Sequence, residues 1–363
     1  MKDLLIVTGA RPNFMKITRF KEVARERGSI RVRTVHTGQQ HDERMTRVFM
    51  EQFGLEVDHF LHGDGTGQAN QLARIMLGLV PVFGAVKPDA VMVVGDVTST
   101  LAGALVANKM GIRLLHLESG LRSRDRSMPE EMNRLLTDRL ADHLFTTEPA
   151  AAINLIGEGV PRERIHHVGN TMIDTLVAFE ERILVDPVME TMGWGKGGHV
   201  LLTIHRPHAV DDPTQAAKLV ELIKGIAMRC HTIFPLHPRT ANNLERHGLL
   251  NGLRATRGLH VAPPLDYFAF QRVLATSSMV ITDSGGVQEE TTYKGVPCLT
   301  LRANTERPIT MTEGTNELVP FDAAMLWRHM DSVLAGTFKK GSVPALWDGH
   351  ATERVLDVID RVL

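Results

Sequence analysis

Residues 279–290, Met-Val-Ile-Thr-Asp-Ser-Gly-Gly-Val-Gln-Glu-Glu, combine a short apolar run, a pair of glycines and the start of a helical pattern. The run at 279–282 predicts a strand that is buried on both faces, and the glycines predict a tight turn. A strand that leads through a glycine turn into a helix is the repeating unit of a parallel α/β sheet. This segment therefore predicts an α/β fold built on parallel strands.

The same order of elements recurs on both sides of this segment. Apolar runs predict strands in the first half at residues 4–7, 32–36, 90–94, 114–117, 143–146 and 165–168. Four further runs predict strands in the second half, namely VLLTIHRP, TIFPLHP, LHVAPP and VPCLTLR. Helical spacing of apolar residues lies between the first-half strands at 20–26, 68–83 and 101–109. The alternation predicts two Rossmann-like, doubly wound parallel sheets.

The length of 363 residues suits two α/β domains. We expect an N-terminal domain at residues 1–170, a linker region at 171–198 and a C-terminal domain at 199–350. Four glycines within 192–198 make that stretch the expected flexible connection. The spacing at 351–363 predicts a helix that can pack back onto the first domain. Because such sheets bind ligands at the carboxyl ends of their strands, we expect the domains to face a central cleft.

The charge balance argues against partners that recognise a net electric field. Lys and Arg total 41 and Asp and Glu total 42, so neither nucleic acid nor a membrane is an expected partner. The sequence shows neither a signal-peptide pattern nor an apolar run of ~20 residues, so a cytoplasmic location is expected. Only two cysteines occur, and they predict neither a disulfide framework nor a cysteine-rich metal site.

The turn at residues 284–286 is a candidate phosphate site. The backbone N–H groups of Ser284, Gly285 and Gly286 could approach a diphosphate closely, and the helix dipole favours its negative charge. Glu290, one to two turns into the helix, could then accept hydrogen bonds from ribose hydroxyls. A plain serine cap followed by a glycine turn has the same pattern, so the motif alone leaves both interpretations open.

Two cations follow the first predicted strand. The segment Gly-Ala-Arg-Pro-Asn-Phe-Met-Lys at 9–16 carries Arg11 and Lys16, and an arginine can bind phosphate through two N–H groups. The segment lacks the GxGxxG pattern of dinucleotide sites, so no nicotinamide cofactor is expected. Solvated surface cations are the alternative interpretation.

Carboxylates follow two more predicted strands, Asp96 after VMVVG and Glu118 after RLLHL, and Glu130 lies further along. An unpaired carboxylate at a buried strand end is costly. Such acids either pair with arginines or transfer protons, and burial can raise their pKa for the second role. Three acids that converge on one cleft favour proton transfer.

Histidines end two neighbouring strands of the second half, His205 in TIHRPH and His237 in LHPR. Imidazoles placed opposite the carboxylates predict acid/base or phosphate-donor roles. A zinc site is the alternative, but these spacings match no standard zinc pattern, so no metal is expected.

Several segments, taken in this order, resemble the UDP-N-acetylglucosamine 2-epimerase family, whose two-domain fold is shared with a large class of nucleotide-sugar glycosyltransferases, the GT-B-like fold. The most specific are HLESGLRSRDRSMPEEMNR, VGNTMID, TIHRPH, DSGGVQEE and LRANTERP. The resemblance spans residues 9 to about 318. It implies an enzyme that interconverts UDP-N-acetylglucosamine and UDP-N-acetylmannosamine without a cofactor, and a homodimer.

The resemblance also implies roles for individual residues. The acid/base groups would be Asp96, Glu118, Glu130 and His205. The UDP-sugar would contact Arg11, Lys16, Leu265, Phe270, Ser284, Gly285, Gly286, Glu290 and Arg307. A second UDP-N-acetylglucosamine, acting as an activator, would contact Gln39, Glu131, Arg206 and His237.

Three departures from the family pattern bear on the sugar and on the activator site. The family segment Gly-Thr-Arg-Pro-Glu is replaced by Gly-Ala-Arg-Pro-Asn at 9–13. The family segment Gly-Asp-Thr is replaced by Gly-Asp-Val at 95–97, and Arg239 replaces an asparagine. Arg11, Lys16 and Asp96 are retained.

Four other functions are alternatives to this epimerase. They are a hydrolysing 2-epimerase that releases N-acetylmannosamine and UDP, an epimerase for another UDP-N-acetylhexosamine, a GT-B glycosyltransferase and a non-catalytic UDP-sugar sensor.

Overall fold

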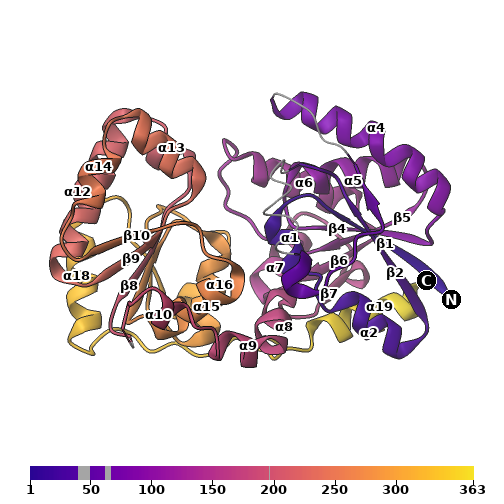
Figure 1. Cartoon of the computed structure of the whole chain (residues 1–363). Coiled ribbons are helices and arrows are strands. Elements are labelled where there is room, and N and C mark those ends of the chain that lie inside the picture. The colour runs from indigo at the N-terminus through magenta and orange to yellow at the C-terminus, as the bar shows by residue number, and fades with distance from the viewer. Residues whose placement is uncertain (40–49, 62–66, 196) are drawn as a thin grey trace. The chain divides into compact units, whose positions relative to one another are not determined.

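The computed structural model describes residues 1–39, 50–61, 67–195 and 197–363, and the chain divides into two compact units. Unit 1 comprises residues 1–178 and 345–363, and unit 2 comprises 179–344. Each unit contains one parallel sheet with helices on both faces (Figure 1). The predicted α/β class with two doubly wound sheets is confirmed.

Unit 1 has a seven-stranded sheet in the order β3-β2-β1-β4-β5-β6-β7. Its strands are β1 Lys2–Thr8, β2 Ile30–His36, β3 His59–Phe60, β4 Ala90–Val94, β5 Arg113–Leu117, β6 His143–Thr146 and β7 Ile165–His167. Its helices are α1 Arg11–Met15, α2 Phe20–Arg27, α4 Gln68–Val86, α5 Thr98–Lys109, α6 Pro129–Leu140, α7 Pro149–Gly157, α8 Thr171–Ala178 and α19 Ala351–Val362, with a 3-10 turn at Arg162–Arg164.

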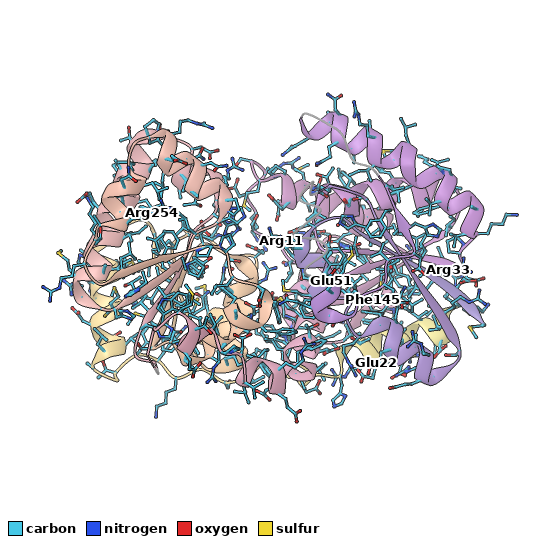
Figure 2. All side chains as sticks on the ribbon, in the orientation of Figure 1. Arg11, Glu22, Arg33, Glu51, Phe145 and Arg254 are labelled. Atoms are coloured by element: carbon cyan, nitrogen blue, oxygen red, sulfur yellow. The ribbon has the colours of Figure 1, made fainter. Side chains whose placement is uncertain are left out.

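The alternation of side chains along β1 produces two cores in unit 1. Leu4 and Ile6 belong to a cluster that includes residues of α2 and α19, whereas Leu5 and Val7 belong to a cluster with α4 and α5. Figure 1 shows α2 beside α19 on one side of the sheet and α4 beside α5 on the other. Phe145 is fully buried within this unit (Figure 2).

Unit 2 has a six-stranded parallel sheet in the order β10-β9-β8-β11-β12-β13. Its strands are β8 Val200–Thr203, β9 Thr232–Pro235, β10 Leu259–Ala262, β11 Met279–Thr282, β12 Cys298–Thr300 and β13 Asn316–Leu318. Its helices are α9 Glu180–Leu184, α10 Val188–Thr191, α11 Pro207–Val210, α12 Pro213–Arg229, α13 Pro238–Arg246, α14 Leu250–Arg254, α15 Tyr267–Thr276, α16 Gly285–Lys294, α17 Ile309–Thr312 and α18 Ala323–Leu334. Leu202 packs with α12 and α18, and Leu201 packs with α10 and α15.

The boundaries of the two units differ from the expected linker at 171–198. The chain leaves unit 1 after residue 178, so α8 belongs to unit 1 and residues 179–195 belong to unit 2. Trp194, inside the glycine-rich stretch, is 5% exposed and packs in the core of unit 2, which anchors that stretch. The chain returns to unit 1 at residue 345, where α19 completes one core cluster.

Helix α4 is apolar over its whole length of 19 residues, and in length and hydropathy it meets the criteria for a membrane span. Only 17% of its most apolar window is buried. Ile75, Leu79 and Phe83 nevertheless pack in a core cluster of unit 1, while Leu77 and Val80 are 74% and 46% exposed. We therefore interpret α4 as a surface helix of unit 1 whose outer face is also apolar.

Candidate functional site

The first part of the candidate site lies where β1 and β4 of unit 1 end. Strand order reverses between these two neighbours, which is where parallel sheets bind ligands. The side chain of Asn13 in α1 joins the two strand ends. Its oxygen accepts hydrogen bonds from the backbone N–H of Gly9 and of Ala10, each at 3.1 Å, and its amide donates to the carbonyl of Val94 at 3.1 Å.

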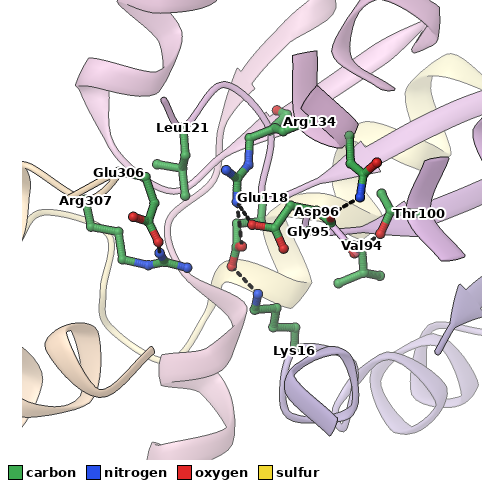
Figure 3. Close-up of polar contacts among 12 residues, drawn as sticks. Lys16, Val94, Gly95, Asp96, Thr100, Glu118, Leu121, Arg134, Glu306 and Arg307 are labelled. Atoms are coloured by element: carbon green, nitrogen blue, oxygen red, sulfur yellow. Dashed lines mark hydrogen bonds and ion pairs between the residues drawn. The ribbon is translucent and has the colours of Figure 1, made fainter. Parts of the chain in front are cut away.

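A cluster of two acids and two cations follows these strand ends (Figure 3). Lys16 Nζ lies 2.5 Å from Glu118 Oε2, and Arg134 contacts both Glu118, at 3.7 Å, and Asp96. Glu118 is only 2% exposed, whereas the side chain of Asp96 is 23% exposed. The structure thus brings together Lys16, Asp96 and Glu118, three of the residues that the sequence suggested, and adds Arg134.

Backbone conformation helps to hold this cluster. Gly95 has a φ of +66°, a left-handed conformation that glycine adopts more readily than other residues. Glu118 itself has a φ of +65°, which is uncommon for a residue with a side chain. Such a conformation persists only where surrounding contacts impose it, and it often marks a functional position.

A second polar layer lies next to this cluster and escaped the sequence analysis. His116 on β5 contacts Asp138 of α6 at 2.6 Å and the carbonyl of Gly95 at 2.8 Å. Asp138 also accepts a hydrogen bond from the Gly120 N–H and pairs with Arg122 at 2.7 Å. Burial by itself would raise the pKa of Asp138, but the contacts with His116 and Arg122 bring it below the ordinary carboxyl value.

Three other candidates of unit 1 lie elsewhere. Glu130 is exposed in the first turn of α6, and among the described residues no hydrogen bond or ion pair joins it to the Lys16 cluster. Glu131 accepts hydrogen bonds from the backbone of Ser123 and Arg124, so it orders the loop before α6. Gln39 accepts from the N–H and hydroxyl of Ser99 at the start of α5.

Arg11 is the first residue of α1 and is partly exposed. It thus lies at the end of β1, as the sequence suggested.

The second part of the candidate site lies between the ends of β8 and β11 in unit 2, where strand order again reverses. Asp283, 1% exposed, accepts hydrogen bonds from the N–H of His205 at 2.9 Å and of Arg206 at 2.8 Å, and it contacts the His205 ring at 2.9 Å. Burial raises the pKa of Asp283, but these hydrogen bonds and the His205 charge lower it more. Asp283 therefore fixes the loop that carries His205.

The N-terminus of α16 follows Asp283 directly. Ser284 is the N-cap, and its side chain makes no capping hydrogen bond, so it does not occupy the N–H groups of the first turn. A Cβ on Gly285 would lie 2.5 Å from Arg307 Nη1 and 2.8 Å from Glu306 Oε1. Arg307 is held against Glu289 at 3.0 Å and against Glu306 (Figure 3). The glycine thus allows a buried guanidinium to approach the start of the helix.

Glu290 is 4% exposed in α16, and burial, together with the neighbouring charge of Glu289, raises its pKa to about 8. The phenol of Tyr267 is also buried, and burial raises its pKa as well. Leu265 and Phe270 are partly exposed and pack on the cluster that includes α15. Glu290 is therefore a buried carboxyl group that is protonated more easily than an exposed one.

The rings of His237 and His205 lie 5.7 Å apart, centre to centre. The Nδ1 atom of His237 accepts a hydrogen bond from the N–H of Arg239 and so caps α13. Arg239 forms a two-point contact with Asp211. Within the described ranges, no group of three or more His, Cys, Asp or Glu side chains is arranged to hold a metal ion.

Comparison with known proteins identifies the family. The sequence profile described as UDP-N-acetylglucosamine 2-epimerase matches residues 22–360, which is most of the chain. The chain belongs to the UDP-N-acetylglucosamine 2-epimerase family.

Two members of the UDP-N-acetylglucosamine 2-epimerase family show how close the similarity is. The UDP-N-acetylglucosamine 2-epimerase of Methanococcus maripaludis is 36% identical over 341 residues, which cover 92% of each chain. The UDP-2,3-diacetamido-2,3-dideoxy-D-glucuronate 2-epimerase of Pseudomonas aeruginosa is 37% identical over 365 residues, which cover 99% of each chain. Both are named 2-epimerases of UDP-linked sugars, so the chain is an isomerase.

Solved structures of the UDP-N-acetylglucosamine 2-epimerase family share the fold. The Methanocaldococcus jannaschii enzyme in complex with UDP-N-acetylglucosamine and UDP has a TM-score of 0.92 and 33% identity, and the match covers 99% of this chain and 100% of that one. The predicted family and its GT-B-like, two-sheet fold are confirmed.

Proposed function

We propose that the protein interconverts UDP-N-acetylglucosamine and UDP-N-acetylmannosamine and retains UDP on its product. The observation that carries the proposal is the cluster of Lys16, Glu118, Arg134 and Asp96. It places two carboxylates beside two cations near the carboxyl ends of the strands of unit 1. The family supports 2-epimerisation of a UDP-sugar, and the relative from Methanococcus maripaludis supports N-acetylglucosamine as the sugar.

The reaction must invert a carbon whose hydrogen is not acidic. The C2 hydrogen of a UDP-linked N-acetylhexosamine is not next to a carbonyl group, so simple enolisation is not possible. Elimination solves this problem. The C1–O bond to UDP breaks, a carboxylate takes the C2 proton, and the electron pair of the C–H bond forms a C1–C2 double bond. UDP then adds back to C1 while a second group protonates C2 from the opposite face.

Inversion therefore needs two acid/base groups, and Asp96 and Glu118 fit this need because Arg134 contacts both. Lys16 and Arg134 would stabilise the carboxylate charges. His205 and Glu130 remain candidates for proton transfer in this proposal, although only His205 is fixed by a buried partner, Asp283.

Unit 2 would hold the leaving group. The N–H groups of Ser284, Gly285 and Gly286 would bind the diphosphate, and Arg307 and Arg11 would balance the charge that grows on it. Glu290 would bind the ribose, with Leu265 and Phe270 against the uracil.

The decisive experiment is turnover in deuterated water, followed by proton NMR. Incorporation of deuterium at C2 with UDP still attached supports the proposal. Free N-acetylmannosamine would show a hydrolysing enzyme, and an unexchanged C2 hydrogen would exclude the elimination route and favour a glycosyltransferase. The exchange assay should be repeated with Asp96→Asn and Glu118→Gln, each of which is expected to slow exchange by about 10²-fold or more. Glu221→Gln, a substitution at an exposed position on α12, is the matched control. This variant should exchange the C2 hydrogen at the normal rate.

Two finer proposals concern assembly and regulation. We propose a homodimer, supported by the exposed apolar face of α4 with Leu77 and Val80.

We also propose that Gln39, Glu131, Arg206 and His237 bind a second UDP-N-acetylglucosamine. Sigmoidal dependence of the rate on substrate, abolished in His237→Ala, is the expected sign of that second molecule.

A further inference from the structure

The side chain of His116 is enclosed between two hydrogen-bond acceptors. It is 0% exposed on β5, with Nδ1 at 2.6 Å from Asp138 Oδ1 and Nε2 at 2.8 Å from the carbonyl oxygen of Gly95. A carbonyl oxygen can only accept a hydrogen bond, so Nε2 must carry a proton.

The second acceptor is a carboxylate that other donors already surround. Asp138 Oδ2 receives the N–H of Gly120 at 3.1 Å and the guanidinium of Arg122 at 2.7 Å. These contacts favour the ionised form of Asp138, which has no proton to offer to Nδ1. Because a neutral imidazole has only one N–H group, it cannot satisfy both partners.

We infer that His116 is a buried imidazolium, and that it acts with Asp138 as a positioning pair for Asp96 and Glu118. Asp138 binds the backbone of Gly120, two residues after Glu118, and reaches the carbonyl just before Asp96 through His116. One carboxylate thus ties the loops that follow β4 and β5 to helix α6.

The charge balance around His116 supports the extra proton. Among the described residues, ion pairs join two anionic side chains, Asp138 and Glu158, to one permanent cation, Arg122. A protonated His116 makes the numbers equal. A neutral ring would leave a net negative charge among side chains that are mostly buried, which is costly.

The protonation state is independent of the proposed function, whereas the positioning role rests on it. The first experiment is NMR of the full-length protein with ¹⁵N-labelled histidine at about pH 8, where an exposed imidazole is neutral. His116 should give two ring N–H signals with imidazolium shifts, and His116→Gln identifies them by their loss. A single ring N–H for His116 in the unsubstituted protein overturns the inference, and this result does not depend on any variant folding.

The second experiment uses Asp138→Asn, which keeps the shape of the side chain and removes its charge. We expect one of the two ring N–H signals to disappear, and kcat to fall about 10²-fold because the acids shift, while KM for the UDP-sugar changes less than about threefold. Asp142→Asn, just past the end of α6 with its carboxylate on the N–H of Leu114, is the matched control and should change neither signal nor rate.

The outcomes separate the two proposals. Two ring N–H signals with a normal kcat in Asp138→Asn would refute the positioning role and leave the imidazolium intact. If the unsubstituted enzyme exchanges no deuterium at C2, the proposed function fails while the NMR result stands.

Discussion

At the scale of single residues, Gly285 is the position where a small change should have a large effect. A Cβ there would lie 2.5 Å from Arg307, whose guanidinium is held by Glu289 and Glu306 and so has little room to move. Gly285→Ala should therefore weaken UDP binding about tenfold or more, which calorimetric titration with UDP would measure. Gly252→Ala in α14, where no described side chain beyond the two chain neighbours lies within 4 Å of the new Cβ, should bind UDP normally and is the control.

Glu290 should make the stability of the protein depend on pH. Its pKa is raised from 4.5 to about 8 by burial, so between these values the folded chain keeps a proton that the unfolded chain has released. The contribution of this group is therefore fully present below about pH 4.5 and is lost as the pH rises through about 8. Thermal unfolding should show the melting temperature falling across this window.

The test of that assignment is the slope of melting temperature against pH. Glu290→Gln, which cannot ionise, should flatten the slope between about pH 5 and 8, and Glu221→Gln on the surface should keep it. An identical slope in Glu290→Gln and the unsubstituted protein would show that another group is responsible.

Sequence reasoning found some site residues and missed others for a physical reason. Asp96 and Glu118 stand out because they follow buried strands, where a charge needs an explanation. His116 is a polar residue within the apolar part of β5, which is a usable signal, but its partner Asp138 lies on helix α6, on a face that only the tertiary structure defines. Glu130 shares a motif with these residues, yet its side chain points to solvent.

At the scale of elements, α8 and α19 depend on each other. Asp174 in α8 is 2% exposed and accepts hydrogen bonds from the N–H of Ala351 at 3.0 Å and of Thr352 at 2.6 Å, so it caps a helix 177 residues further along. Asp174→Ala should lower the free energy of unfolding by about 1–2 kcal/mol, as loss of a helix cap does. Chemical denaturation would measure this change.

A matched control for the cap is Asp357→Ala in α19, whose ion pair with Arg27 is largely exposed. This substitution should lower the free energy of unfolding by well under ~1 kcal/mol. Equal losses in the two variants would argue that Asp174 contributes no more than a surface charge.

Most strands were predictable, including the edge strands β7 and β10. The runs predicted at 90–94 and 143–146 coincide with β4 and β6, because a strand covered on both sides is rich in apolar residues. The edge strands β3 and β13 escaped detection. His59–Phe60 is only two residues long, and Asn316–Leu318 begins with two polar residues, of which Asn316 is bonded by Gln288 and Thr300 inside unit 2.

At the scale of the whole molecule, the apolar outer face of α4 should decide the oligomeric state. Leu77→Glu places a charge at a side chain that is 74% exposed, so it should leave the fold intact and break a dimer formed through this helix. Light scattering coupled to gel filtration would then give the mass of a monomer. Met228→Glu, at an 80% exposed position on α12, should leave the dimer unchanged. A monomeric unsubstituted protein, or a dimeric Leu77→Glu, would refute the assembly.

The return of the chain to unit 1 at residue 345 has a consequence for biosynthesis. In the order of translation, unit 2 is an insertion within unit 1, so a nascent chain can complete the sheet of unit 2 while the sheet of unit 1 still exposes part of its core. Val355 and Ile359, which are 0% exposed and belong to a core cluster of unit 1, cover this part of the core only after α19 has been synthesised. Unit 1, which carries Asp96 and Glu118, therefore completes its core after unit 2. It exposes apolar surface for longer during synthesis, so chaperones have more time to bind it.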